Sequence, residues 1–587
     1  MKKYIGIILA IIIFVTQLSL IRGVGMTWDE PASFFIGRMN LQFWQTLDWT
    51  NVIDYVNTKR FAASPMYFVS GEELYPPFPF LVSSAASYIL AERTHLMNFI
   101  DAYHVGEILL GSIGVGAFYG LAIEMGLTVP IATGTTLIFA LYPTIFGQMR
   151  NDAKDIPLMS MLIVSVYVFF RFLRSWRERG VSQSWGWGFL WAVTLGLAED
   201  SKPSAAIIVL ILAPWLFISL FINQTFRKRM KQFPLFLLSV ACFGLLAVAI
   251  FFLAWPWLWD NPVKKIEMVF AFFKIVGYNM PVLYLGHLYR AGISLPKSYP
   301  YAILLFQTPI EITIFAVTGM LVGLWGVIKK RNIWYLFLLL WFWLGIGRFL
   351  LPGFLIYAKV RHFIDVMPAF FLLTGVGVEY IVSLFITALM SARVLFSSVK
   401  QYKLSSPIVH NLRDGDQKRA PHRAGILITM IVITGIIIHE IIISIMFYPY
   451  EPSYFNFLVG GSRTVAQKQL FDIEYWGSGT REAMEYIDSQ AEGPVSVYSC
   501  LMRHLTMYYN TPNVTMMRDH PEYATYTLVP NSPSWFGEPL KFSRDLQTPV
   551  YLVQRAGADL FYVYKNTSHF GYRCGNETLT TYGYKAP

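Results

Sequence analysis

The sequence predicts a polytopic α-helical membrane protein with a small mixed α/β domain in its C-terminal region. Hydrophobic residues make up 55% of the 587 residues, charged residues make up 14%, and the mean hydropathy is +0.46. A soluble globular domain carries about 25% charged residues. The apolar residues are also gathered in long runs, as bilayer-spanning helices require. These observations exclude a soluble globular protein.

The first apolar run, residues 4–21, contains 18 residues and no charge. Met1-Lys2-Lys3 before it resembles the start of a signal peptide, but no small-x-small cleavage site follows the run. We therefore expect it to be retained as the first membrane helix. Further apolar segments lie at about 102–123, 128–148, 156–173, 185–199, 203–222, 233–257, 301–327, 333–351, 362–388 and 424–447. About eleven spans are expected in all.

The basic residues predict the orientation of these spans. With Lys2 and Lys3 in the cytoplasm, about eleven spans place every major basic cluster on the cytoplasmic side, as the positive-inside rule requires. These clusters are Arg171/Arg174/Arg177/Arg179, Arg227/Lys228/Arg229/Lys231, Lys329/Lys330/Arg331 and the loop 393–423. We therefore expect a multi-pass protein of the cell (plasma) membrane with a cytoplasmic N-terminus. The net charge of +11 indicates orientation and contact with membrane lipids, not nucleic-acid binding.

Two domains are expected. Residues 1–447 form the transmembrane domain, which includes a long outer loop at 22–101, and residues 448–587 form an extracytoplasmic α/β domain. In the second, residues 481–487 are helix-like, and residues 495–499, 550–553 and 560–564 are strand-like. Cys500 and Cys574 lie there, where a disulfide is chemically permitted, and whether they pair is left open.

The first candidate site is the acidic pair Asp29-Glu30, directly after the first span. A carboxylate at this depth is able to act on a polar substrate while a lipid-linked reactant approaches from the side. The alternative is that both residues cap an interfacial helix that begins near Pro31. The spacing of apolar residues over 31–55 is typical of such an amphipathic helix.

A second charged stretch, Arg150-Asn151-Asp152-Ala153-Lys154-Asp155, joins two spans on the same outer side. Asp155 is a candidate acid that faces Asp29, and Lys154 is a candidate phosphate ligand. The alternative is a solvated turn in which Asp155 caps the next helix. Lys202 and Arg361 also stand at outer helix ends, where a cation opposes the helix dipole and needs a partner such as a lipid phosphate.

Charged residues within the spans are costly and are expected to face the bundle interior, without a catalytic role. They are Glu107, Glu311, Arg348, Glu379 and Glu440. No Asp-x-Asp motif follows the first helix, so no metal ligands are assigned and no cofactor is expected. A divalent metal stays open.

Taken together, the motifs resemble those of GT-C fold glycosyltransferases that use a lipid-phosphate sugar donor. The nearest groups are the protein O-mannosyltransferases (glycosyltransferase family 39) and the aminoarabinose–lipid A transferases. The resemblance spans residues 1 to about 480, and its motifs are Asp29-Glu30, Tyr75-Pro76-Pro77-Phe78-Pro79-Phe80, Asn151-Asp152-Ala153-Lys154-Asp155-Ile156-Pro157, Leu195-Gly196-Leu197-Ala198 with Lys202, Gln307-Thr308-Pro309, Arg361-His362-Phe363 with Met367-Pro368, Tyr454-Phe455-Asn456 with Val459-Gly460-Gly461, and Asp472 with Tyr475-Trp476-Gly477.

The resemblance implies an inverting transfer of a sugar from a polyprenyl or dolichyl phosphate to a hydroxyl of a protein, a lipid or an envelope glycan. The sugar would be a hexose such as mannose. Asp29 would be the base, with Glu30 as its neighbour, and Asp155 would orient the acceptor or Asp29. Relatives often carry His or Lys where this chain has Tyr75. Donor phosphate binding is therefore expected to depend on Arg361, Lys154, Lys202 and Lys59.

Two alternatives stay open from the sequence. A secondary transporter is also polytopic, but it usually shows paired half-repeats with broken helices, and no such repeat is visible. An oligosaccharyl-type transferase of the same fold should carry a set of metal-binding carboxylates, and no such set is recognisable in the sequence.

Overall fold

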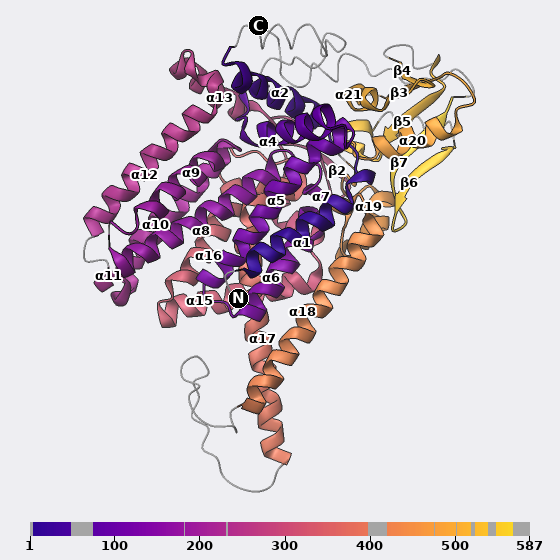
Figure 1. Ribbon diagram of the computed structural model, residues 1–587. Helices are drawn as coiled ribbons and strands as arrows, with labels where there is room; N and C mark the ends of the chain where they lie inside the picture. The colour runs from indigo at the N-terminus through magenta and orange to yellow at the C-terminus, as the bar shows by residue number, and fades with distance from the viewer. Residues whose placement is uncertain are drawn as a thin grey trace.

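The protein consists of a helical bundle that carries a small mixed sheet at one end (Figure 1). The computed structural model describes residues 4–48, 74–180, 182–229, 233–396, 419–474, 476–499, 502–517, 523–537 and 548–566. The N-terminus and helix α11 (Gln224–Arg229) lie toward the end of the bundle that faces away from the sheet. Helix α2 (Glu30–Thr46) and helix α13 (Pro262–Ile275) lie at the end on which the sheet stands.

The bundle is completed by helices of six to 30 residues. They are α1 (Ile5–Ser19), α4 (Phe78–Ser87), α5 (Phe99–Glu124), α6 (Val129–Leu141), α7 (Pro143–Gln148), α8 (Asp155–Arg179), α9 (Trp185–Glu199), α10 (Ile207–Ile222), α12 (Phe233–Ala254), α14 (Tyr299–Gln307), α15 (Ile310–Lys330), α16 (Ile333–Gly347), α17 (Met367–Phe396) and α18 (Arg419–Phe447). Every expected span is helical, which confirms the polytopic α-helical fold.

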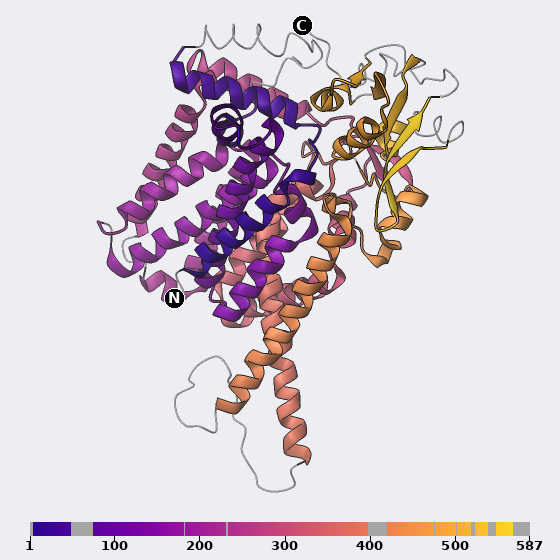
Figure 2. The same ribbon diagram turned by 45° about the vertical axis from the view of Figure 1, so that its right-hand side comes forward.

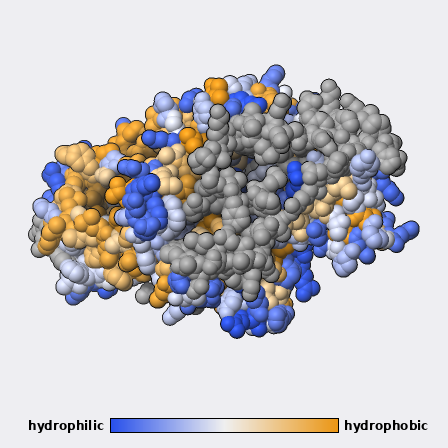
Figure 3. All heavy atoms as spheres, turned by 90° about the horizontal axis from the view of Figure 1, so that it is seen from above, coloured by the Kyte–Doolittle hydropathy of each residue, from blue (hydrophilic) through white to orange (hydrophobic). Residues whose placement is uncertain are grey.

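Eight of the described helical segments are long and apolar enough to cross a membrane. The other expected spans, α1, α6 and α9, are helices of 15, 13 and 15 residues. A helix needs about 20 residues to cross the bilayer core, so the count of eleven stays a prediction. Exposed leucines and valines cover α12, and Figure 3 shows apolar side chains gathered on the flank where α12 and α13 lie. Such a flank suits contact with lipid.

Two of the expected spans are not single helices, because each is divided into two. Residues 128–148 are divided into α6 and α7 at Tyr142-Pro143, and residues 301–327 are divided into α14 and α15 at Thr308-Pro309. Proline has no N–H for the helical hydrogen bond, and its ring forces the preceding residue into extended backbone. Tyr142 and Thr308 accordingly have ψ values of 127° and 131°.

The expected amphipathic helix is α2, which buries Phe34, Phe35 and Phe43. It packs closely on α4, because a Cβ atom at Gly37 would lie 2.2 Å from the backbone oxygen of Phe80. The helix ends at Thr46, where Leu47 adopts a left-handed conformation with φ of 55°. Residues 49–55 of the expected helix lie outside the described residues.

The C-terminal region contains a five-stranded mixed sheet in the order β4-β3-β5-β7-β6 (Figure 2). Strands β3 and β4, and β3 and β5, are parallel, whereas β7 is antiparallel to both β5 and β6. The elements of this region are α19 (Gly461–Lys468), α20 (Thr480–Gln490), β3 (Val495–Ser499), α21 (Arg503–Thr506), β4 (Val514–Met516), β5 (Tyr526–Pro530), β6 (Tyr551–Arg555) and β7 (Ala558–Lys565). The predicted helix and three strands are confirmed, whereas β4 and β5 were not expected. Cys500 and Cys574 lie outside the described residues.

The C-terminal region is held to the bundle by polar contacts. The guanidinium of Arg150 lies 2.5 Å from the Glu451 carboxylate, and both side chains are fully buried. Arg481 of α20 lies 2.8 Å from Asp101 of α5. The N–H of Trp28 donates to the carbonyl oxygen of Trp476 at 2.7 Å. A β-hairpin of β1 (Pro281–Tyr284) and β2 (His287–Arg290) also bridges to Phe471 through Tyr284.

We predict that Arg150→Met destabilises the protein by about 3–5 kcal/mol, because it leaves the Glu451 carboxylate buried without a partner. Thermal or denaturant unfolding of the purified protein in detergent measures this change.

Arg174→Met is the matched control, and this substitution should cost under about 1 kcal/mol. Arg174 and its partner Glu178 are both exposed, and its other partner, Glu124, keeps Arg171 at 2.7 Å. Equal losses in the two variants would contradict the prediction.

Candidate functional site

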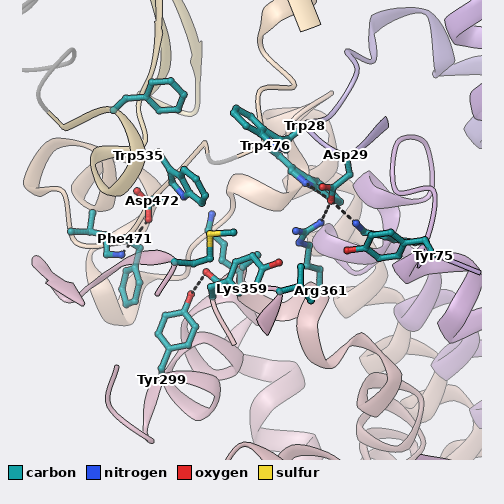
Figure 4. A pocket seen from close by; sticks show the side chains of 17 residues that line it. Trp28, Asp29, Tyr75, Tyr299, Lys359, Arg361, Phe471, Asp472, Trp476 and Trp535 are labelled. Carbon is teal, nitrogen blue, oxygen red and sulfur yellow. Dashed lines mark hydrogen bonds and ion pairs between the residues drawn. The ribbon is translucent and has the colours of Figure 1, made fainter. Parts of the chain in front are cut away.

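The carboxylate of Asp29 is bound by three side chains from distant parts of the chain (Figure 4). Its Oδ2 accepts from Nη1 of Arg361 at 2.7 Å, lies 3.0 Å from Nζ of Lys154, and lies 3.3 Å from Nε1 of Trp476. Asp29 is the residue before α2, yet its side chain makes no capping hydrogen bond. The capping alternative for Asp29 is therefore wrong, and its carboxylate faces a pocket instead.

Asp155 lies close to this arrangement at the start of α8. Its Oδ1 accepts from Nζ of Lys202 at 2.6 Å, and its Oδ2 lies 3.7 Å from Nη1 of Arg361. The same nitrogen of Arg361 therefore reaches both carboxylates. Asp155 is the first residue of α8, it is buried, and its carboxylate is paired with Lys202 and Arg361, so the alternative of a solvated turn is wrong. The structure thus brings together five of the seven predicted site residues: Asp29, Lys154, Asp155, Lys202 and Arg361.

We call Lys154, Lys202 and Arg361 the cation cluster. Burial by itself would raise the pKa of Asp29, but Lys154 and Arg361 outweigh burial and hold that pKa well below its usual range. The two carboxylates and the three cations together carry a net charge of +1. This charge matches the single negative charge of a phosphodiester.

Aromatic residues are the largest group that lines the pocket beside Asp29, together with apolar side chains and five charged ones. Such a lining is typical of small-molecule sites. One end holds Asp29 and Arg361, and the other holds Lys359 and Asp472 (Figure 4). Lys154 lies at the first end, where it pairs with Asp29. The remaining lining residues are Trp28, Tyr75, Val276, Met280, Leu283, Tyr299, Tyr357, Ala358, Phe471, Trp476, Trp535 and Phe536.

Aromatic rings position two members of the cation cluster. The Arg361 guanidinium lies 4.3 Å from the centroid of the Trp476 ring, and Nζ of Lys154 lies 4.8 Å from that of Tyr75. Cations are attracted to aromatic faces at these distances. Tyr75 stands at the position where relatives often carry a cation. Its ring instead positions Lys154, a cation that another segment of the chain supplies.

Several lining residues were not predicted as site residues. Trp476 and Asp472 belong to a motif that carried the family resemblance, so a signal for them existed. Trp535 of the C-terminal region, Met280 directly before β1 and Leu283 in β1 have no comparable signal, because tertiary packing alone brings them to the pocket.

Two predicted site residues are not part of this arrangement. Glu30 is fully buried and is not among the residues that line the pocket. Its carboxylate accepts from the N–H of Thr27 at 2.5 Å and lies 2.6 Å from Nε2 of His104. Lys59 lies outside the described residues.

Asp152 has a structural role that the sequence did not reveal. Its Oδ1 accepts from the backbone N–H groups of Asp155 and Lys154 at 2.9 and 3.3 Å, and so it holds the turn that presents both residues. Burial and the neighbouring charge of Asp155 raise the pKa of Asp152 to about 8. Asp152 is therefore largely neutral at neutral pH, whereas Asp29 is ionised.

Comparisons with known proteins bear on the fold and the class of the protein. Residues 93–271, which are under half of the chain, match the family model described as dolichyl-phosphate-mannose-protein mannosyltransferase. The structure is similar to that of ArnT from Cupriavidus metallidurans bound to undecaprenyl phosphate, with 14% identity, a TM-score of 0.50, and coverage of 97% of this chain and 98% of that chain. A weaker similarity, with 12% identity and a TM-score of 0.47, links it to the oligosaccharyltransferase of Archaeoglobus fulgidus tethered with an acceptor peptide, over 97% of this chain and 74% of that chain. No curated protein matches the sequence significantly.

The predicted resemblance is confirmed. The chain has a GT-C fold and is a membrane glycosyltransferase. The family match favours an enzyme over the transporter alternative.

We predict that Asp152→Asn gains stability relative to the wild type as the pH rises from about 4 to about 8. The folded pKa of Asp152 lies above its unfolded value of 3.8, so the wild type loses stability over this interval as the unfolded state releases the proton first. Asparagine keeps the acceptor oxygen and does not titrate. Unfolding midpoints of both proteins across this range measure the effect, and a constant difference would contradict it.

Proposed function

We propose that this chain transfers a hexose from a polyprenyl or dolichyl phosphate to an acceptor hydroxyl, in the pocket beside Asp29 and on the membrane face that carries the C-terminal sheet. The observation that supports it most is the cation cluster around Asp29 and Asp155 at the end of an aromatic pocket. By the orientation predicted from the basic clusters, this face is extracytoplasmic and the membrane is the plasma membrane.

The reaction is a single displacement at the anomeric carbon. The acceptor oxygen forms a bond to that carbon, the bond from the carbon to the phosphate oxygen breaks, and the sugar configuration inverts. The acceptor proton passes to the Asp29 carboxylate, which acts as general base. The leaving group is the polyprenyl phosphate, whose new negative charge is stabilised by the cation cluster. Asp155 holds Lys202 and Arg361 in place for this task.

Donor binding also prepares the base. Arg361 and Lys154 hold the pKa of Asp29 so low that its carboxylate is a weak base in the free protein. A donor phosphate competes for the same N–H groups, and each contact that it takes from Asp29 raises the pKa of that carboxyl group. The base is therefore strengthened only when the leaving group is present.

Mannose is the first donor sugar to test, because the matching family model is described by dolichyl-phosphate-mannose. A protein hydroxyl is the corresponding first acceptor, and lipid and envelope-glycan hydroxyls complete the panel. The part of the pocket away from Asp29 is lined by aromatic rings. Lys359 and Asp472 at its far end are polar groups that suit the hydroxyls of a sugar.

We predict that Asp29→Asn lowers transfer by roughly 10²–10⁴-fold, the usual contribution of a general base. Asparagine retains the size of aspartate but cannot accept the proton. Asp155→Asn should do less, because it disturbs only the position of the cations. Transfer of labelled sugar by purified protein at saturating donor measures both effects.

Asp260→Asn is the matched control, since its side chain is 94% exposed and does not line the pocket. It should transfer at the wild-type rate. Near-normal transfer by Asp29→Asn together with loss in Asp155→Asn would assign the base to Asp155 instead.

We further predict that Arg361→Ala raises the KM for the donor much more than the KM for the acceptor, because Arg361 offers the planar donor set that fits phosphate oxygens. Arg290→Ala is the control, as Arg290 lies in β2 and does not line the pocket. Initial rates with each substrate varied in turn separate the two constants. An equal rise in both would mean that Arg361 does not bind the donor selectively.

A further inference from the structure

A second cluster of ionisable side chains lies behind Asp29, away from the pocket. It consists of Glu30 at the start of α2 with His104 and Glu107, which are three residues apart on α5 and share one face of that helix. One carboxylate or imidazole atom from each residue lies within 4.8 Å of the others, and all three residues are fully buried.

The carboxylate of Glu107 is aimed into this cluster without a partner. Neither of its oxygens has a hydrogen-bond partner among the described residues, and the same holds for Nδ1 of His104. Within the part of the chain that the structure describes, no lysine or arginine forms an ion pair with Glu30 or Glu107. Burying two neighbouring carboxylates is costly unless their charge is compensated.

We propose that Glu30, His104 and Glu107 bind a divalent transition-metal ion of the zinc class. An ion of charge +2 compensates both carboxylates, and a neutral imidazole with two carboxylates is a donor set that suits zinc. The imidazole disfavours Mg²⁺ and Ca²⁺, which prefer oxygen ligands. The unpaired Nδ1 allows His104 to carry its proton there while Nε2 binds the ion.

Binding requires a small rearrangement of side chains. Zinc lies about 2.1 Å from such ligands, which places ligand atoms roughly 3.4 Å apart in a tetrahedral site. The 2.6 Å contact between Glu30 and His104 therefore opens, and the Glu107 carboxylate moves inward. Any proton held by these ligand atoms is released to solvent.

The ion would connect the first turn of α2 to α5 directly beside the peptide that carries Asp29. Glu30 would then act as a metal ligand and a positioning residue, which explains why an acidic residue follows Asp29 yet faces away from the pocket. The role is separate from the proposed transfer reaction, and it does not depend on that proposal.

The test measures zinc binding by the full-length protein in detergent. The protein is treated with EDTA, dialysed to equilibrium against ZnSO₄, and analysed for bound metal by mass spectrometry, and its thermal unfolding is recorded with and without zinc. We expect the wild type to bind one more zinc ion per chain than Glu107→Gln and His104→Asn do, and to unfold at a higher temperature when zinc is bound.

Glu440→Gln is the matched control, because Glu440 is also fully buried, and neither of its carboxylate oxygens has a partner among the described residues. It lies on α18, outside the cluster. It should bind zinc as the wild type does. Equal zinc content in the wild type and Glu107→Gln, or a wild-type unfolding temperature that zinc leaves unchanged, would overturn the proposal. The cluster would then be a buried network of protonated and hydrogen-bonded side chains.

Discussion

The ion pairs of Asp29 are the interaction on which the site depends. A carboxylate in this position would be costly to bury alone, and Lys154, Arg361 and the indole of Trp476 offset that cost. These partners come from the α7–α8 turn, the segment before α17 and the link to the C-terminal sheet. Forming the pocket and docking the C-terminal region are therefore one event, since each supplies groups that the other needs.

The supports of the site are themselves buried polar contacts. Arg361 lies in the 3-10 helix η7 (Lys359–Val366), and Arg348 holds that helix through Asp365 and the carbonyl oxygen of His362. Asp152 holds the turn that presents Lys154 and Asp155. Because such contacts have few alternative geometries, they fix the cations before any substrate arrives. Fixed charges stabilise a developing phosphate charge without reorganisation during the reaction.

The sequence was sufficient to predict much of this arrangement. Apolar runs predicted the helices, and alternation predicted β3, β6 and β7. The charged outer stretch predicted Lys154, and cations at outer helix ends predicted Lys202 and Arg361. It was insufficient where the outcome depends on tertiary contacts. Asp29 and Glu30 are adjacent, yet only the packing of α2 on α4 and α5 decides that one faces the pocket and the other faces His104. Trp535 reaches the pocket only through docking of the sheet, and Pro143 and Pro309 divide helices that hydropathy alone joins.

The central claim is that the lipid phosphate takes the place of Asp29 as a partner of the cations. A cryo-electron microscopy structure of the purified protein with bound polyprenyl phosphate tests it most directly. We expect the phosphate within hydrogen-bonding distance of Arg361 and at least one of Lys154 and Lys202, with a contact between Asp29 and these cations lengthened or lost. A phosphate bound elsewhere, with the Asp29 ion pairs unchanged, would contradict the account.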